Sequence, residues 1–189
     1  MRVLDLFCGI GGWSLAAERA GHTVVGAYDT DSNRLAVYKV NLSRAPTKAD
    51  LFALQEFPEA DLWILSQPVR RALAFCPAIL AHAPQAVLIE SAADPFDVLE
   101  EALAIYSPTV FVAGGRRFLL GGATITSVEF KKSRPPSPTR YEAVEDAEEA
   151  QGFPRGYTAV CGAKDTRQRA LYNSVDLNVA TEIMRRIAF

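Results

Sequence analysis

The chain is poor in the residues from which metal centres and disulfide frameworks are built. Its 189 residues include three cysteines, Cys8, Cys76 and Cys161, and two histidines, His22 and His82. The cysteines are odd in number, far apart and without a C-x-x-C pair, which argues against a disulfide framework and a zinc site. The histidines are isolated and lack the spacing of metal ligands. We therefore expect no metal site, and the unpaired cysteines fit a reducing cytoplasm.

The sequence also lacks a long hydrophobic run and a strong excess of charge. No apolar stretch approaches the roughly 18 residues of a membrane span, and no basic segment precedes the apolar core of a signal peptide. A net charge of −2 and a pI near 5.7 differ from the basic excess of proteins that bind nucleic acid by bulk electrostatics. With 49% hydrophobic residues and no internal repeat, we expect one globular domain over residues 1–189.

The most informative stretch lies near the start of the chain. An apolar run from Val3 to Phe7 is followed by Cys8-Gly9-Ile10-Gly11-Gly12, and helical apolar spacing begins at Trp13. This order predicts a strand, a glycine turn and a helix. Glycines let a ligand approach the main chain closely, and the helix N-terminus favours a nucleotide-like guest. Short glycine turns also occur as structural corners, so both interpretations stay open on this stretch alone.

Strand and helix signals alternate through the first two-thirds of the chain, which predicts an α/β fold with a parallel sheet covered by helices. Further strands are expected at residues 23–28, 61–65, 86–90 and 109–113. Helices are expected at residues 33–42 and 70–83 and within 95–106, and Pro77 should kink its helix or start a new turn. Gly114-Gly115 predicts a tight hairpin, after which residues 118–130 return as a β-rich arm.

The remainder of the chain differs in composition. Lys131 to Arg140 is a basic, proline-rich stretch that we expect to be an extended and exposed linker. An acidic helix around residues 142–149, a turn at 151–154 and a closing helix from about 175 to 187 follow it.

Three segments together resemble motifs of the DNA cytosine-C5 methyltransferases, which use S-adenosylmethionine. Asp5 to Gly12 is similar to the first motif of that family, Gln151 to Pro154 to the ninth, and Asn173 to Val175 to the tenth, in the family's order. The resemblance implies a Rossmann-like methyltransferase fold. Its sheet would be mostly parallel and seven-stranded, with a C-terminal antiparallel hairpin and helices on both faces.

The resemblance also implies a site for S-adenosylmethionine or S-adenosylhomocysteine. Asp29 would take the ribose hydroxyls, and Asp50 with Leu51 would read and cover the adenine. For either aspartate alone, loop or cap chemistry is the favoured interpretation, whereas the two together, in register with the motifs, favour the cofactor. The cofactor-binding residues implied by the family motifs are Asp5, Phe7, Cys8, Gly9, Ile10, Gly11, Gly12, Asp29, Thr30, Asp50, Leu51, Pro68, Asn173 and Ser174.

The chain departs from the family where the chemistry takes place. The family's nucleophilic cysteine adds to C6 of a flipped cytosine, and here Val69 follows Pro68 at that position. An isopropyl group has no lone pair and cannot form the adduct. Glu90 occupies the place of the family's cytosine-binding glutamate and is the one catalytic residue that the resemblance assigns, although a structural role for this strand-end carboxylate stays open.

The parts that would hold DNA are reduced as well. The mobile loop that follows the nucleophile in the family is missing here. A short basic linker, residues 131–140, stands where the target-recognition domain would be inserted. The residues left as weak nucleic-acid contacts are Arg116, Arg117, Lys131, Lys132 and Arg134.

These observations favour a catalytically degenerate, cytoplasmic member of the family that binds the cofactor and acts as a regulatory or accessory partner. The partner would be a methyltransferase or another DNA-processing protein, and DNA would bind only weakly to the chain alone. Two alternatives stay open. One is an active methyltransferase on DNA or a related substrate, alone or as half of a split enzyme, and the other is a purely structural interaction module. The sequence leaves the oligomeric state undetermined.

Overall fold

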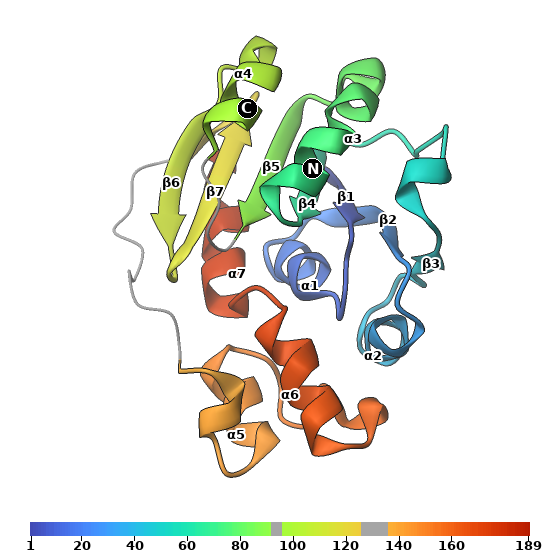
Figure 1. The fold of residues 1–189 in the computed structure, drawn as a ribbon, viewed down its shortest axis with the longest axis vertical. Coiled ribbons are helices and arrows are strands. Elements are labelled where there is room, and N and C mark those ends of the chain that lie inside the picture. The colour runs from blue at the N-terminus through green and yellow to red at the C-terminus, as the bar shows by residue number, and fades with distance from the viewer. Residues whose placement is uncertain (92–95, 126–135) are drawn as a thin grey trace.

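The computed structural model describes residues 1–91, 96–125 and 136–189. Its centre is a seven-stranded sheet in the order β3-β2-β1-β4-β5-β7-β6 (Figure 1). The pairs among the first five strands are parallel, whereas β7 runs antiparallel to both β5 and β6. The predicted fold class is therefore confirmed. The strands are β1 (Arg2–Leu6), β2 (Thr23–Asp29), β3 (Thr47–Lys48), β4 (Leu62–Ser66), β5 (Ala86–Ser91), β6 (Thr109–Ala113) and β7 (Arg116–Gly121).

Helices cover both faces of the sheet. On one face lie α1 (Gly12–Arg19), α2 (Ser32–Asn41) and α7 (Leu177–Arg186), and on the other lie α3 (Val69–His82) and α4 (Asp97–Ala102). Two further helices, α5 (Val144–Ala150) and α6 (Lys164–Tyr172), lie together at one end of the molecule (Figure 1). Short 3-10 turns occur at η1 (Leu51–Ala53), η2 (Ala104–Tyr106), η3 (Pro138–Arg140) and η4 (Ala159–Cys161). No helix in the described ranges has the length and apolar character needed to cross a membrane.

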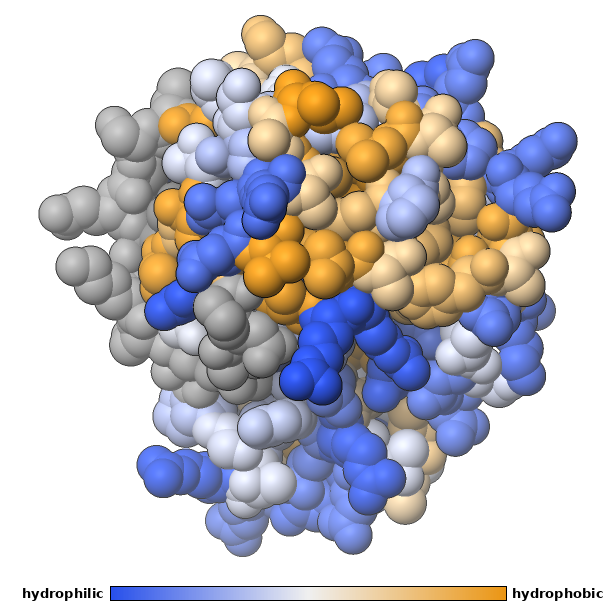
Figure 2. Space-filling model, turned by 45° about the horizontal axis from the view of Figure 1, so that its top comes forward, coloured by the Kyte–Doolittle hydropathy of each residue, from blue (hydrophilic) through white to orange (hydrophobic). Residues whose placement is uncertain are grey.

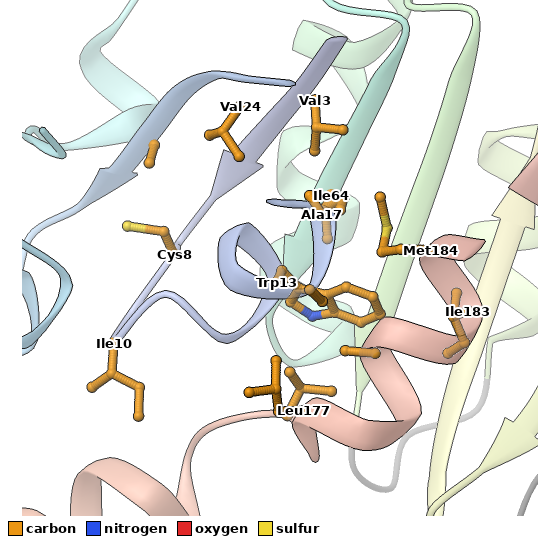
Figure 3. Packing of buried hydrophobic residues seen from close by; sticks show 14 of the residues in the cluster. Val3, Cys8, Ile10, Trp13, Ala17, Val24, Ile64, Leu177, Ile183 and Met184 are labelled. Atoms are coloured by element: carbon orange, nitrogen blue, oxygen red, sulfur yellow. The ribbon is translucent and has the colours of Figure 1, made fainter. Parts of the chain in front are cut away.

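The central strands β1, β4 and β5 are buried on both faces, as their predominantly apolar sequences predict. Side chains alternate along β1, so that Val3 packs toward α1 and α7 whereas Leu4 and Leu6 pack toward α3. On the first face, Figure 3 shows the indole of Trp13 directed from α1 toward Met184 on α7. The two apolar layers hold the carboxyl ends of β1, β4 and β5 in fixed positions.

The hairpin at Gly114-Gly115 forms as predicted. Both glycines have positive φ, 55° and 71°, and Ala113 pairs directly with Arg116. The β-rich arm expected over residues 118–130 is confirmed for the described part as two short strands, β7 and β8, because the chain leaves the seven-stranded sheet at Gly122, where φ is 76°. Beyond this turn β8 (Thr124–Ile125) pairs antiparallel with β9 (Ile187–Ala188), and residues 126–130 lie outside the described residues.

One other expectation needs correction, and two are refined. Of the two alternatives for Pro77, a new turn is excluded because α3 continues through it, with Phe75, Cys76 and Ile79 in the core on both sides of the proline. The linker is not extended at residues 138–140, which form a 3-10 turn with Pro138 buried, while residues 131–135 lie outside the described residues. The closing helix expected from about 175 to 187 is confirmed as α7, which ends at Arg186 because Ile187 and Ala188 join the small second sheet. The sequence analysis also missed β3 and α6.

Candidate functional site

A cavity of about 420 Å³ lies at the carboxyl ends of β1, β4 and β5. The strand order reverses between β1 and β4, and such a switch point is where open α/β sheets bind ligands. The cavity is enclosed by the glycine turn, the segments after β4 and β5, the hairpin strand β7 and the connection from α6 to α7. Its lining residues are Phe7, Cys8, Gly9, Ile10, Gly12, Trp13, Arg34, Ser66, Gln67, Pro68, Arg71, Glu90, Ser91, Arg116, Ala170, Tyr172, Asn173, Ser174 and Val175.

The glycine turn requires its glycines for two different reasons. Gly11 has φ 90°, and a Cβ there would lie 2.2 Å from Leu42 Cδ1. At Gly12 a Cβ would lie 2.8 Å from Ser174 Oγ, so this glycine permits close packing of the α6–α7 connection. Gly9 also has positive φ, 54°, but only Arg34 comes as close as 4.0 Å. The turn is therefore tightly packed at Gly11 and Gly12 and open at Gly9.

Asp5 supports the turn from below without lining the cavity. Its Oδ2 accepts hydrogen bonds from the Ser14 backbone N–H at 3.0 Å and from Ser14 Oγ at 2.6 Å. These bonds hold the first turn of α1 against β1. The side chain is completely buried, and burial raises the pKa of this carboxyl from 3.8 to about 7. Its Oδ1 has no hydrogen-bond partner in the part of the chain that the structure describes.

Asp29 and Asp50 each make local hydrogen bonds. Asp29 accepts one from the Gly9 N–H at 2.9 Å and one from the Asp31 N–H at 2.9 Å, which ties the glycine turn to the end of β2. Asp50 caps η1 by accepting from the Phe52 N–H at 3.1 Å. Both carboxylates lie outside the cavity lining, and their contacts with ribose and adenine stay predictions.

The structure brings together about half of the predicted site. The predicted residues that line the cavity are Phe7, Cys8, Gly9, Ile10, Gly12, Pro68, Glu90, Arg116, Asn173 and Ser174. The predicted residues that do not line it are Asp5, Gly11, Asp29, Thr30, Asp50, Leu51 and Arg117, and Leu51 packs into the core beneath α3. Lys131, Lys132 and Arg134 lie outside the described residues.

Several lining residues were missed by the sequence analysis. Ser66 and Gln67 belong to the segment that replaces the family's fourth motif, so their position could have been read from it. Trp13 follows the glycine turn directly. Arg34 and Arg71 give no such signal, because only the packing of α2 and α3 against the sheet brings them to the cavity.

Glu90 is fully engaged by neighbouring donors. Its Oε2 accepts hydrogen bonds from Trp13 Nε1 at 3.1 Å and from Ser66 Oγ at 2.6 Å. Arg116 Nη1 lies 2.6 Å from Oε1 as an ion pair, although not in the alignment of a hydrogen bond. The carboxylate is buried and the guanidinium nearly so. Glu90 therefore has a structural partner on each side.

Arg116 also closes the cavity on the side of α6. Its Nη2 donates to the backbone carbonyl of Ser174 at 3.0 Å and to that of Tyr172 at 3.3 Å. One guanidinium thus connects Glu90 on β5 with the α6–α7 connection that carries Asn173 and Ser174.

The nucleophile position holds no reactive group. Val69 is the first residue of α3, is buried, and packs with Leu65 and Phe75 rather than lining the cavity. Among the thiols only Cys8 lines the cavity, and burial raises its pKa well above the usual value, which suppresses the thiolate. The remaining two thiols also have raised pKa values from burial.

Two further arginines, Arg34 and Arg71, line the cavity. Arg34 pairs with Asp31 at 3.4 Å, and Arg71 is exposed.

Figure 2 shows apolar side chains gathered in the upper half of one face of the molecule and hydrophilic ones in the lower half. The described residues contain no cluster of potential metal ligands.

Comparison with known proteins shows what these features are similar to. Residues 1–69 match the family model described as C-5 cytosine-specific DNA methylase. No curated protein matches the chain. The matched segment includes the glycine turn, Asp29, Asp50 and the position of Val69.

Solved structures resemble the chain over nearly its whole length. A protein assigned as a DNA modification methyltransferase, encoded within a prophage of E. coli, has a TM-score of 0.74 at 14% identity, covering 98% of this chain and 97% of that one. Dnmt2 of S. pombe has a TM-score of 0.70 at 14% identity, covering 96% of each chain. A Spodoptera frugiperda DNMT2 mutant has a TM-score of 0.69 at 12% identity, covering 97% of this chain and 98% of that one.

Such low identities establish the fold, whereas the family model concerns the sequence itself. Residues 1–69 are thus similar in sequence to the C-5 cytosine-specific DNA methylases, and nearly the whole length of the chain has the Rossmann-like fold of methyltransferases.

Proposed function

We propose that the chain binds S-adenosylmethionine or S-adenosylhomocysteine in this cavity and acts, without catalysing methyl transfer itself, as a regulatory or accessory partner. The observation that carries the proposal is a contrast within one site. The glycine turn is built in full, whereas Val69 at the start of α3 is buried and offers no nucleophile. In this proposal the chain acts in the cytoplasm.

The residues present fit a nucleoside with an amino-acid tail. A cavity of about 420 Å³ is within the usual range for small-molecule sites. Phe7 offers an apolar ring, the open backbone at Gly9 permits close approach, and Asn173 with Ser174 supplies polar groups opposite. When bound, the cofactor would supply an activated methyl group. These four residues would hold and orient it.

Two features support a function in binding rather than in catalysis. Glu90 already has Trp13, Ser66 and Arg116 as partners, so reading the edge of a cytosine would require breaking a buried ion pair. The stretch of residues 131–140, where the family inserts its target-recognition domain, is only a short segment. A partner methyltransferase or another DNA-processing protein would have to supply the contacts with DNA.

Calorimetric titration tests the cofactor part of the proposal. We expect saturable binding of both S-adenosylmethionine and S-adenosylhomocysteine. We also expect a rise in melting temperature, because a ligand at 100 times its dissociation constant stabilises the folded state by about 2.7 kcal/mol. The absence of heat and of a thermal shift with either compound would refute cofactor binding.

An active methyltransferase is the second candidate, because Glu90 and Arg116 both line the cavity at the place of a substrate base. Transfer of a tritiated methyl group to DNA, RNA or nucleotides separates the two. We expect no incorporation by the chain alone. Incorporation by the chain alone would establish the enzyme, whereas incorporation only when a second protein is added would support an accessory or split-enzyme function.

A further inference from the structure

The two edges of the seven-stranded sheet differ in their protection against pairing with another strand. The β3 edge is two residues long and carries Lys48, whose ammonium donates to Ser32 Oγ at 2.7 Å. The β6 edge is five residues long, Thr-Val-Phe-Val-Ala, and has no charged side chain and no proline. Short or charged edges resist strand addition, whereas long uncharged edges favour it. Only the β6 edge therefore has the properties of a pairing surface.

The hairpin register shows which backbone groups of β6 point outward. Ala113 and Arg116 flank a two-residue turn, so they form a hydrogen-bonded pair, and such pairs recur at every second residue of an antiparallel ladder. The next two hydrogen-bonded pairs are Phe111 with Phe118 and Thr109 with Leu120. The N–H and C=O groups of Val110 and Val112 consequently point away from β7, toward the side of β6 that pairs with no strand of residues 1–91, 96–125 and 136–189.

The side chains of these same two residues are apolar. Val112 is 52% exposed, and Val110 is partly buried against the core beneath α3 and α4. Because side chains alternate along a strand, both valines lie on the same face of the sheet. Ile105, in the turn just before β6, is a further apolar side chain and is 75% exposed.

The sequence around Phe111 is symmetric. Two β6 strands can pair antiparallel with the Phe111 residues of the two copies opposite each other. Val110 of the first copy then lies opposite Val112 of the second, and Val112 of the first lies opposite Val110 of the second. Both are then hydrogen-bonded pairs, so four backbone hydrogen bonds form and each exposed Val112 packs against a valine. Because the same residues of both copies form the contact, the pairing is compatible with a two-fold symmetric dimer.

We propose that β6 is the interface of a symmetric homodimer, in which the sheets of two copies join through antiparallel β6 strands. A second copy is the occupant that this edge fits, because its apolar, uncharged pattern matches itself in register. Since two five-residue edges bury less surface than a standard interface, the dimer should dissociate on dilution. No residue of β6 lines the cavity, so this inference does not depend on cofactor binding.

Sedimentation velocity over a wide range of concentration tests the proposal. We expect the full chain to change from monomer to dimer as concentration rises. Val112→Lys should weaken association by about tenfold or more, because it places a lysine opposite Val110 in each of the two hydrogen-bonded pairs next to the two-fold axis. The matched control is Val160→Lys, since Val160 is 50% exposed but lies on η4, and this variant should dimerise like the wild type. Melting temperatures of both variants check that the fold is retained.

Hydrogen exchange locates the interface independently. The amides of Val110 and Val112 should exchange quickly in dilute solution and become protected at high concentration, whereas the Phe111 amide, bonded to β7, is protected throughout. A wild type that stays monomeric at millimolar concentration overturns the proposal, even if the edge accepts a strand from another protein. Dimerisation that is unaffected by Val112→Lys overturns it as well.

Discussion

The guanidinium of Arg116 lies 2.6 Å from the carboxylate of Glu90, across two antiparallel strands. The strand register explains the contact, because Glu90 pairs with Phe118 and Arg116 is two residues away on the same face of β7. The ion pair is buried between the sheet and α1, and it extends through Arg116 to the carbonyl of Ser174. A carboxylate that the family resemblance assigns to a substrate is thus part of the framework of the cavity.

Replacing Arg116 with methionine should lower the free energy of unfolding by about 3–5 kcal/mol, because the variant leaves Glu90 buried without a counter-charge. Urea denaturation measures the change. The double variant Arg116→Met with Glu90→Gln should recover part of the loss, since the charge is removed together with its partner. The neighbouring Arg117→Met is the matched control, because Arg117 is exposed and should change the stability by no more than about 0.5 kcal/mol. Equal effects of the two single variants would contradict a buried ion pair.

The raised pKa of Asp5 should make stability depend on pH in a defined direction. The carboxyl titrates near 3.8 when the chain is unfolded and at about 7 when it is folded. Between these values the folded state holds a proton that the unfolded state has lost, so stability falls as pH rises from about 4 to about 7 and then levels off. Each unit of pKa difference corresponds to about 1.4 kcal/mol.

The test is the difference in free energy of unfolding between the wild type and Asp5→Asn, followed across this pH range. Taking the difference removes the contribution of other titrating groups, and it should decline steadily toward neutral pH. The control Asp165→Asn changes an exposed aspartate at the start of α6 and should keep the wild-type slope. A constant difference for Asp5→Asn would show that Asp5 is ionised in the folded state throughout.

Local sequence patterns predicted the parts of the fold that depend on local interactions. The continuous apolar runs of β1, β4 and β5 and the glycines at 114 and 115 determine their own structure. Helix α6 was missed because its segment, Lys164 to Tyr172, is predominantly polar and shows little apolar periodicity. It is held by a tertiary contact instead, in which Arg167 donates to the buried carboxylate of Glu148 at 3.0 Å.

The site could be predicted only where a motif is continuous in sequence. The glycine turn and the Asn173-Ser174 segment were found because each is a short run with its own spacing. Arg34 and Arg71 come from the helices that follow β2 and β4, and only the crossover connections bring them to one cavity. Asp50 was assigned to the cofactor by the family resemblance, but in the structure it caps η1. Capping is the local chemistry that a single aspartate most simply provides.

Gly11→Ala should destabilise the chain more than Gly21→Ala does. Both glycines have strongly positive φ, 90° and 80°, so both substitutions incur the left-handed backbone strain of roughly 1–2 kcal/mol. Only at Gly11 would the new Cβ also meet neighbours, Leu42 Cδ1 at 2.2 Å and Tyr38 Cδ2 at 2.8 Å, whereas nothing lies within 4 Å at Gly21. Thermal denaturation of both variants separates the effect of backbone strain from that of steric overlap. Equal losses of stability would mean that α2 and its side chains move away from the turn at no energetic cost.

Restoring a cysteine at the nucleophile position should not restore activity. Val69→Cys places the thiol at the first position of α3, where the present side chain is buried in the core and does not line the cavity. A thiol in apolar surroundings has a raised pKa and little thiolate, so it neither attacks a base nor reacts quickly with a thiol reagent.

Pro68→Cys provides the matched control, because Pro68 is exposed and lines the cavity. Titration of native protein with a disulfide reagent should show one additional fast-reacting thiol in Pro68→Cys and none in Val69→Cys, relative to the wild type. Tritiated methyl transfer to DNA should stay at background for Val69→Cys, and incorporation above background would show that the start of α3 moves to expose residue 69 when substrate binds.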